Sequence, residues 1–382
     1  MVEWCGVILA GGKGTRLYPL TRDIPKPMIT VTNKPMIHYA IDLLRYAGIN
    51  KIIIVVKHFG DKIKEYVEKT EWHVDVRVPN VDSLDTADAL KKVSQYISSN
   101  ENIIVSMADI VTNINIKEFM EYSLNKNAFS TISMLSSDMP KQFGVIILDQ
   151  DNKIHSFLEK PATHELYLSS LATKHSSVYL HTNLINTGLY YFKNQILNIL
   201  NENNSLMDFG KHVFPYLLDN NYDLFGYISK YYWMDAGNPK FYLYTNWDLL
   251  RKWAYPIVPL GEEVQEYKWI EEKNTCKIHQ NSIIDPHVVI GKNTQLDEQV
   301  VVENLSSIGK NVYIGKNSRI RESVIWDNVK IGSNCLVKSS IICNNVEIED
   351  EVTILDWSII PPNSKVPKGT QITNTIYEEG II

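Results

Sequence analysis

Residues 7–27 of the chain read VILAGGKGTRLYPLTRDIPKP, and this stretch determines which fold to expect. Its first four residues are aliphatic or small and predict a buried β-strand, which is followed by three glycines within residues 11–14. Because glycine lacks a Cβ atom, backbone N–H groups can approach phosphate oxygens closely, and the cations Arg16 and Lys26 can neutralise the phosphate charge. The stretch therefore predicts a strand followed by a loop that holds a polyphosphate.

Two common phosphate-binding motifs do not fit this loop. A Walker A motif needs Ser or Thr after its lysine, whereas Lys13 is followed by Gly14. The dinucleotide-binding fingerprint would place its third glycine at Leu17. The alternative to a phosphate site is a glycine turn that leads into a basic surface loop.

Strands and helices alternate from this loop up to about residue 250. The predicted strands are 7–10, 51–56 and 102–106, and the predicted helices are 36–44 and 88–93. The alternation predicts an open, doubly wound, mixed α/β sheet of Rossmann-like type that is mostly parallel. Ligands of such sheets bind beyond the carboxyl ends of the strands, so the residues just after Ala10 and Ser106 are the first candidates for chemistry.

The pattern changes to a six-residue repeat after a connector. The aliphatic positions of the repeat are Ile278, Ile284, Ile290, Leu296, Val302, Ile308, Ile314 and Ile320, with Trp326 as the expected last member. A period of six predicts a parallel β-helix with coils of about 18 residues, and register slips beyond Trp326 indicate single-residue shortenings at corners. We therefore expect a sheet domain at 1–250, a connector at 251–275, a β-helix at 276–376 and a tail at 377–382.

Composition limits the possible partners. The chain has 382 residues, enough for two domains, and a net charge of -6, which argues against a bulk electrostatic grip on nucleic acid or on an anionic membrane. Its four cysteines form no C-x-x-C pair, so neither zinc nor a disulfide framework is indicated. Without an apolar run of roughly 18 residues, we expect a cytoplasmic protein with no membrane partner.

Further motifs complete a resemblance to a known family. These are Asp109 after a strand, FGV at 143–145, FLEKP at 157–161, NTGLY at 186–190 and WMDAGNP at 233–239. With residues 11–27, they resemble the nucleotide-sugar pyrophosphorylases, also called sugar-1-phosphate nucleotidyltransferases. Many members append a left-handed β-helix, so the resemblance covers nearly the whole chain and implies that the predicted β-helix is left-handed.

The resemblance implies a reaction in which an NTP and a sugar-1-phosphate give an NDP-sugar and pyrophosphate. It implies that Arg16 stabilises the departing pyrophosphate and that Lys26 contacts the phosphates near the reacting centre. The implied nucleotide-binding residues are Leu9, Ala10, Gly11, Gly12, Gly14, Thr15, Asp85, Thr86 and Ala87. The implied residues for the sugar phosphate are Gly144, Glu159, Lys160, Asn186 and Gly188. By the same resemblance, Asp109 and Asp235 hold Mg²⁺, a hard ion that takes one or two carboxylates.

The sequence departs from the family at the base-binding turn. Residues 84–90 read LDTADAL where the family usually has LGTAGAL, so Asp85 and Asp88 replace two glycines. One interpretation is that Asp85 caps a helix and Asp88 lies in its first turn. Another is that one carboxylate accepts the N1–H and N2–H donors of guanine. The link at 163–183 is also longer than usual.

Two questions stay open at this point. The resemblance favours mannose-1-phosphate guanylyltransferases and similar glucose-1-phosphate enzymes, but it does not resolve the base or the sugar. The aspartates also permit a weakly active regulatory subunit of the same fold that partners an active relative. We expect the β-helix to serve assembly in a homo-oligomer, with a hetero-oligomer as the alternative.

Overall fold

A computed structural model describes residues 3–136, 145–158, 178–179 and 184–378. Contacts between Cα atoms divide the chain into two compact units. The first unit contains residues 1–12 and 40–233, and the second contains residues 13–39 and 234–382. The predicted link at 163–183 lies outside the described residues except for a short strand at 178–179.

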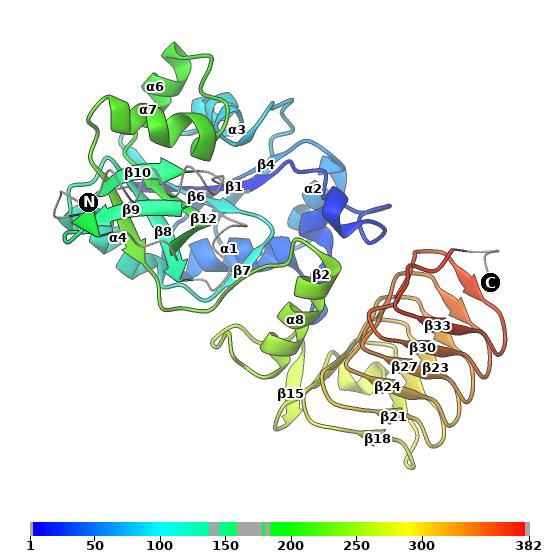
Figure 1. The fold of residues 1–382 in the computed structure, drawn as a ribbon. Helices are drawn as coiled ribbons and strands as arrows, with labels where there is room; N and C mark the ends of the chain where they lie inside the picture. Colours follow the sequence, from blue (N-terminus) through cyan, green and yellow to red (C-terminus); the bar gives the residue numbers. More distant parts are fainter. Residues whose placement is uncertain (1–2, 137–144, 159–177, 180–183, 379–382) are drawn as a thin grey trace. The chain divides into compact units, whose positions relative to one another are not determined.

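The first unit is built on a mixed sheet that has ten strands among the described residues (Figure 1). The strands are β1 (Glu3–Ala10), β4 (Lys51–Val56), β5 (Asp75–Arg77), β6 (Glu101–Met107), β8 (Ser130–Ser136), β9 (Val145–Asp149), β10 (Ile154–Leu158), β11 (Val178–Tyr179), β12 (Leu184–Phe192) and β13 (Leu224–Ile228). The predicted strands 7–10, 51–56 and 102–106 are thereby confirmed within β1, β4 and β6.

Parallel pairing occupies the centre of this sheet. β1 pairs in parallel with both β4 and β6, and Val7, Ile53 and Val105 on these strands are completely buried. Such β-branched runs suit strands that are covered on both faces. β12 runs antiparallel to β6 and β8, which confirms the predicted mixed sheet, although its antiparallel part is larger than the alternation of strands and helices suggested.

Short helices connect these strands. They are α1 (Met36–Tyr46), α2 (Gly60–Glu68), α3 (Thr86–Lys92), α4 (Ile116–Asn125), α6 (Ile196–Glu202) and α7 (Phe214–Asp219), and a short strand β7 (Ile110–Thr112) lies outside the main sheet. α1 and α3 confirm the helices predicted at 36–44 and 88–93. The side chain of Asn115 caps α4 by accepting from the backbone N–H groups of Lys117 and Glu118, which explains where that helix begins.

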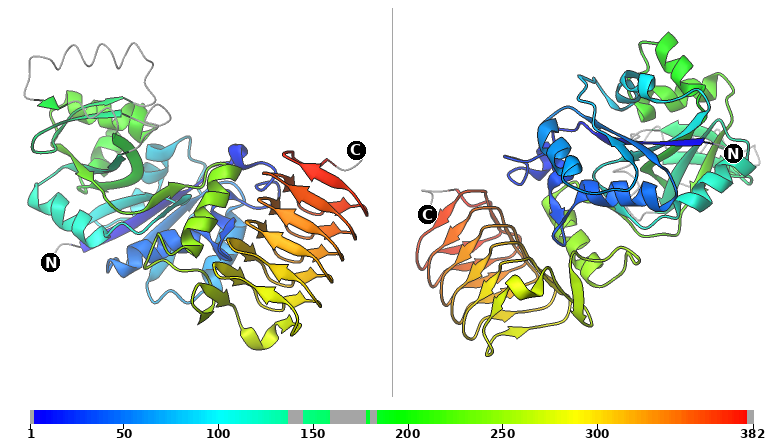
Figure 2. Two further views of the ribbon diagram at one scale, coloured as in Figure 1. Left: turned by 60° about the horizontal axis from the view of Figure 1, so that its bottom comes forward. Right: turned by 180° about the vertical axis from the view of Figure 1, so that it is seen from behind.

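The second unit contains a parallel β-helix whose coils stack one on another (Figures 1 and 2). Its first face has β16 (Lys268–Ile270), β19 (Val288–Ile290), β22 (Ser306–Ile308), β25 (Val324–Ile325), β28 (Ile341–Ile342) and β31 (Ile359–Ile360), edged by β15 (Glu262–Gln265). The second has β17 (Lys277–Ile278), β20 (Gln295–Leu296), β23 (Tyr313–Ile314), β26 (Lys330–Ile331), β29 (Glu347–Ile348) and β32 (Lys365–Val366). The third has β18 (Ile283–Ile284), β21 (Val301–Val302), β24 (Arg319–Arg321), β27 (Leu336–Lys338), β30 (Thr353–Leu355) and β33 (Gln371–Thr373).

The aliphatic column of the repeat forms the β-helix core, with one correction. Ile308 pairs with Ile325 one coil later, so the inward position belongs to Ile325 and the prediction that Trp326 ends the column was wrong. The coil between Ile308 and Ile325 is one residue shorter than the coils before it, so the slip occurs one step earlier than the sequence suggested. Trp326 is buried elsewhere, where its indole Nε1–H donates to the Tyr242 hydroxyl at 2.8 Å.

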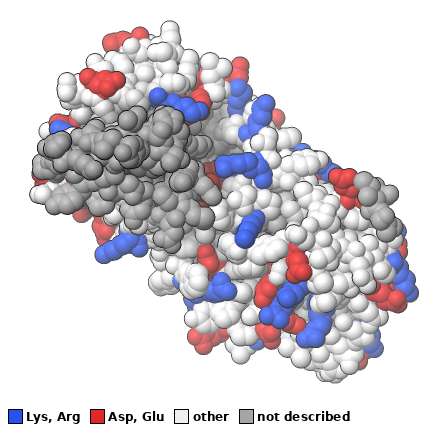
Figure 3. All heavy atoms as spheres, viewed as in Figure 1, with Lys and Arg blue, Asp and Glu red and all other residues white. Residues whose placement is uncertain are grey.

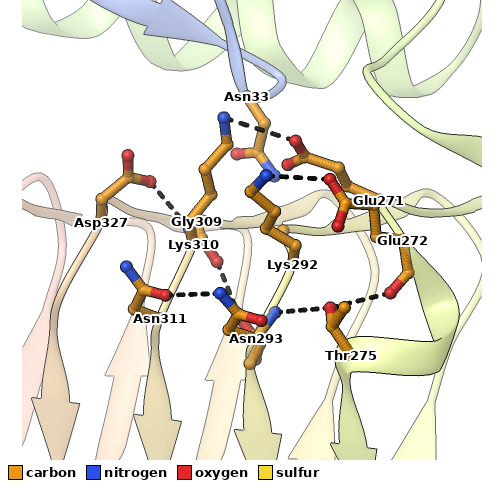
Figure 4. A network of polar contacts seen from close by, with 12 residues as sticks. Asn33, Glu271, Glu272, Thr275, Lys292, Asn293, Gly309, Lys310, Asn311 and Asp327 are labelled. Atoms are coloured by element: carbon orange, nitrogen blue, oxygen red, sulfur yellow. Dashed lines mark hydrogen bonds and ion pairs between the residues drawn. The ribbon is translucent and has the colours of Figure 1, made fainter.

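An asparagine ladder runs along one corner of the β-helix (Figure 4). The amide of Asn293 donates to Asn311, Asn311 donates to Asn328, and the ladder continues through Asn345 to Asn363. Each of these residues has a positive φ, a conformation that asparagine tolerates better than most residues. Every rung therefore satisfies amide groups of a neighbouring coil and holds the coils in register.

The long helix α8 (Pro239–Leu250) joins the β-helix to residues 13–39 inside the second unit. The hydroxyl of Tyr242, which is completely buried, accepts from Trp326 and donates to the backbone oxygen of Thr30 at 2.7 Å. The amide of Asn33 donates to the backbone oxygen of Ile308 at 2.7 Å. Residues 13–39, which contain most of the predicted phosphate loop, are thus held by hydrogen bonds to α8 and the β-helix.

Candidate functional site

The carboxyl ends of β1, β4 and β6 meet at one edge of the first unit's sheet. Ala10 pairs with Val56, Leu9 pairs with Met107, and the backbone N–H of Ala108 donates to Leu9 at 3.1 Å. The glycines at 11 and 12 and the candidate metal ligand Asp109 therefore follow neighbouring strand ends, as expected for a ligand-binding edge of an α/β sheet.

Lys57 is a residue of this edge that the sequence reasoning missed. A Cβ atom on Gly11 would lie 3.5 Å from the Cβ atom of Lys57. The ammonium of Lys57 donates to the backbone oxygen of Ser83 and also pairs with the Asp82 carboxylate. The hydrogen bond from Lys57 to Asp82 lowers the pKa of the Asp82 carboxyl. Lys57 directly follows the predicted strand 51–56, so the rule applied to Ala10 and Ser106 would have found it.

The turn with the two unusual aspartates begins α3. Asp85 is the N-cap residue and accepts from the Thr86 backbone N–H at 2.9 Å, which confirms the capping interpretation. The Asp88 carboxylate is buried, accepts from the backbone N–H of Leu84 at 2.7 Å and pairs with Lys92 at 3.4 Å. Both aspartates therefore stabilise the turn, and Asp85 is the one that remains exposed.

Asp208 supports the same turn from a distant part of the chain. The Thr86 hydroxyl donates to Asp208 at 3.0 Å, and the backbone N–H of Ala87 donates to Met207 at 2.8 Å. Partial loss of hydration raises the pKa of the Asp85 carboxyl, and the negative charge of Asp208 raises it further. The turn that carries the predicted nucleotide-binding residues 85–87 is thus held both by its own helix cap and by hydrogen bonds to residues 207–208.

Asn186 and Gly188 lie on β12, which pairs with β6. The amide of Asn186 donates to the Tyr190 hydroxyl at 2.9 Å, while its oxygen accepts from the backbone N–H of Gly188 at 3.0 Å. Gly188 has a φ of 78°, and a Cβ atom there would lie 2.7 Å from the side chain of Met107 at the end of β6. A side chain at position 188 would therefore disturb the strand end that precedes Asp109.

In the second unit, the rest of the predicted phosphate loop is tightly turned. Gly14 has a φ of 65°, and a Cβ atom there would lie 2.9 Å from Thr21. The Thr21 hydroxyl donates to the backbone oxygen of Gly14 at 3.0 Å, which fixes this turn. Thr15 and Arg16 follow on a short 3₁₀ turn, where both are exposed and therefore accessible to a ligand.

Lys26 and Asp235 are far apart in sequence but lie close together in the second unit. The Lys26 ammonium lies 3.3 Å from the Asp235 carboxylate, and the Lys26 side chain is only 8% exposed. A Cβ atom on Gly237 would lie 2.7 Å from the Asp235 carboxylate oxygen, so glycine is needed there to leave the carboxylate its position. The structure thus brings together one residue predicted to bind phosphate and one predicted to bind metal.

Carboxylate oxygens suit a hard cation rather than a zinc-type site. Asp109 and Asp235 offer carboxylate oxygens, which Mg²⁺ prefers. Among the described residues, no three His, Cys, Asp or Glu side chains gather as they would in a metal cage held by protein alone. The predicted sugar-phosphate residues Gly144, Glu159 and Lys160 lie outside the described residues.

The described surface carries both signs of charge. Figure 3 shows acidic and basic side chains together on the face that it draws. No helix among the described residues is long and apolar enough to span a membrane.

Comparisons with known proteins match both parts of the chain. A family model described as nucleotidyl transferase matches residues 5–252, and one described as the EIF2B subunit epsilon LbH domain matches residues 267–372. A UTP–glucose-1-phosphate uridylyltransferase of Synechocystis is 27% identical over 338 residues, which cover 84% of this chain and 82% of the relative. A mannose-1-phosphate guanylyltransferase of Arabidopsis thaliana is 25% identical over 84% of this chain and 85% of its own length.

Two further similarities cover about two thirds of the chain. A mannose-1-phosphate guanyltransferase of Debaryomyces hansenii is 30% identical over 62% of both chains. A solved structure of a putative glucose-1-phosphate thymidylyltransferase from Bacillus anthracis, in complex with sucrose, has a TM-score of 0.52 and 24% identity, and the match covers 64% of this chain and 94% of that one. This similarity supports the fold, and the second family match supports the left-handed type of the β-helix.

Proposed function

This chain belongs to the nucleotidyl transferase family, and we propose that it transfers a nucleotidyl group from an NTP to a sugar-1-phosphate, releasing pyrophosphate. The reaction is of the EC 2.7.7 type. The sugar phosphate oxygen attacks the α-phosphorus, the bond from the α-phosphorus to the α,β-bridging oxygen breaks, and pyrophosphate leaves with that electron pair. The nucleophile is already an anion, so the protein needs no general base.

The protein's main task in this reaction is to bring two polyanions together and neutralise them. We assign Leu9, Ala10 and the glycines at 11, 12 and 14, with Thr15, to hold the nucleotide through backbone N–H groups. Arg16, which is exposed, stabilises the departing pyrophosphate, and Lys26 neutralises charge near the reacting phosphorus. Asn186, Gly188, Gly144, Glu159 and Lys160 are assigned to the sugar phosphate.

The carboxylates of Asp109 and Asp235 suit Mg²⁺, and we propose that they hold it. The ion would supply positive charge to the phosphate oxygens. Lys26 lies against Asp235 and limits how far this carboxylate can move. Gly237 leaves the space that the Asp235 carboxylate occupies.

The positions of Asp85 and Asp88 support a proposal for the base. The buried Asp88 carboxylate already accepts from the backbone N–H of Leu84 and pairs with Lys92, so it is not available to a nucleobase. Asp85 is exposed and caps α3, and we assign its carboxylate as the candidate acceptor for guanine N1–H or N2–H. We therefore favour GTP with mannose-1-phosphate, with glucose-1-phosphate as the second sugar.

The contact between Lys26 and Asp235 is the observation that carries this proposal. The two residues are 209 positions apart, and each was selected from a different motif of the family. A buried ammonium beside a carboxylate suits a site that neutralises phosphate charge and binds a divalent cation.

A pyrophosphate-release assay on the purified chain tests the proposal. Four NTPs are combined with mannose-1-phosphate and glucose-1-phosphate in the presence of Mg²⁺. We expect turnover with GTP and one of the sugars, whereas activity with ATP but not GTP would contradict the role given to Asp85. No turnover with any pair would favour the regulatory subunit. We further propose that the chain works in the cytoplasm as a homo-oligomer, which light scattering of the purified chain would test.

A further inference from the structure

An open hollow of about 400 Å³ lies in the second unit, between the beginning of α8 and the later coils of the β-helix. It is lined by Asn238, Pro239, Lys240, Leu243, Ile341, Trp357 and Asn374. Its volume lies in the range of pockets that bind one small ligand, roughly 300–1,000 Å³. None of the residues assigned to the nucleotidyl transfer reaction lines it.

A cation and an aromatic ring face each other in this hollow. The ammonium of Lys240 lies 5.4 Å from the ring centre of Trp357 and 5.8 Å from that of Tyr244. Within the part of the chain that the structure describes, Lys240 forms no ion pair. The hollow therefore offers one unneutralised positive charge beside the flat face of an indole.

The β-helix places this indole at the surface by lengthening one corner. Val337 pairs with Ile354, 17 residues later, but Ile341 pairs with Ile359, 18 residues later. The corner between β30 and β31 thus holds one residue more than the corner between β27 and β28. Asp356 and Trp357 occupy this corner, and both have a positive φ.

A side chain as large as that of Trp357 is unusual at a positive φ and needs an explanation. Asparagine is the commonest residue with positive φ at the corners of this β-helix, because it tolerates the left-handed region. Leu305 is another large exception, but it is only 7% exposed, whereas Trp357 is 36% exposed. Tyr244 and Trp247 of α8 hold the indole from one side, with ring centres 5.7 and 5.8 Å away. Unfavourable backbone kept at an exposed aromatic residue is typical of a ligand site.

We propose that this hollow binds a small anion with a flat ring, its phosphate or carboxylate pairing with Lys240 and its ring stacking on Trp357. Pro239, Leu243 and Ile341 supply the apolar wall for the ring. The amide of Asn374 supplies a further polar contact at the rim. The inference is independent of the reaction proposed above, because it uses none of the same residues.

The test is a titration of the full chain with phenyl phosphate, which carries both required groups. We expect saturable quenching of tryptophan fluorescence, because the ring covers the Trp357 indole. Inorganic phosphate, which lacks the ring, and benzyl alcohol, which lacks the charge, are each expected to bind at least roughly tenfold more weakly. Glucose 6-phosphate, which carries a phosphate but no flat ring, is likewise expected to bind at least roughly tenfold more weakly.

Variants locate the binding in the hollow. Trp357→Asn introduces the residue that other corners use and is expected to abolish the quenching, while Lys240→Gln weakens binding at least roughly tenfold and leaves the indole in place. Trp253→Phe is the matched control, because Trp253 is also exposed and lies 5.0 Å from the guanidinium of Arg251 but does not line the hollow. Calorimetric binding constants for Lys240→Gln decide the matter if Trp357→Asn fails to fold.

Three results would overturn the proposal. One is an equal affinity for phenyl phosphate in the wild type and in Lys240→Gln. Another is loss of the quenching in Trp253→Phe instead of Trp357→Asn. The third is equal binding of inorganic phosphate and phenyl phosphate, since the ring would then contribute nothing. Pyrophosphate release is measured separately, so a chain without turnover would leave this result unaffected.

Discussion

Replacing Tyr242 by phenylalanine tests the link between the β-helix and residues 13–39. The hydroxyl accepts from the indole N–H of Trp326 at 2.8 Å and donates to the backbone oxygen of Thr30 at 2.7 Å, and the whole side chain is buried. Phenylalanine keeps the ring and removes both hydrogen bonds. A buried polar group that loses its partner costs about 1–3 kcal/mol, and a typical hydrogen bond contributes about 1 kcal/mol.

We therefore expect Tyr242→Phe to lower the free energy of unfolding by about 2 kcal/mol, since two bonds are lost. In a unit of about 150–250 residues, this corresponds to a decrease of roughly 4–8 °C in Tm. Differential scanning calorimetry of the purified chain measures the shift. A second observable is the urea midpoint followed by tryptophan fluorescence, because Trp326 reports on the affected unit.

Tyr191→Phe is the matched control for this experiment. Tyr191 is also completely buried, but within the described residues its hydroxyl has no hydrogen-bond partner. Burial without a partner raises the pKa of this hydroxyl to about 12. Removing it is expected to leave the stability unchanged or to increase it slightly. If Tyr242→Phe and Tyr191→Phe changed the Tm equally, the two hydrogen bonds of Tyr242 would contribute nothing and our reasoning would be refuted.

Three further predictions concern the candidate site. Lys26→Ala is expected to slow pyrophosphate release at saturating substrates at least tenfold, or about 1.4 kcal/mol of barrier, and an unchanged rate would remove Lys26 from the site. Gly237→Ala brings a Cβ atom within 2.7 Å of the Asp235 carboxylate, so it is expected to raise the Mg²⁺ concentration for half-maximal rate by roughly tenfold in a metal titration. The pKa of Asp85 is raised in the fold by partial loss of hydration and by Asp208, so its ionised form opposes folding at pH 7. Asp85→Asn keeps the helix cap and should raise the Tm at pH 7, and this gain should vanish below the ordinary aspartate pKa of about 3.9, as melting curves at several pH values would show.

The strands and the β-helix could be predicted because their signals are local. Aliphatic runs followed by glycine indicated β1, and a six-residue period indicated the coils. The outward position of Trp326 could not be predicted from the repeat. A step of five residues from Ile320 reaches Ile325 and a step of six reaches Trp326, and both residues are apolar. Only the pairing of Ile308 with Ile325 decides between them. The reason for a tryptophan at 326 lies in its hydrogen bond to Tyr242, which is 84 residues away.

The candidate site shows the same distinction between local and distant signals. The capping role of Asp85 was predictable, because an aspartate before a helical run is a local signal. Asp208 supports the turn at 85–87 from 122 residues away, and no sequence periodicity predicts this contact. Likewise, the sequence gives no indication that residues 13–39 leave the first unit and are held by α8 and the β-helix.

That arrangement has a consequence for synthesis on the ribosome. The backbone N–H of Thr32 donates to the side chain of Asn246, a partner 214 residues further along the chain. At about 5–20 residues per second, the early segment emerges roughly 10–40 s before α8 exists. During that interval the nascent chain must keep residues 13–39 available and unaggregated while the strands around them are already being translated. Mutations in the codons for α8 can therefore impair a loop whose Thr32 is encoded 214 codons earlier.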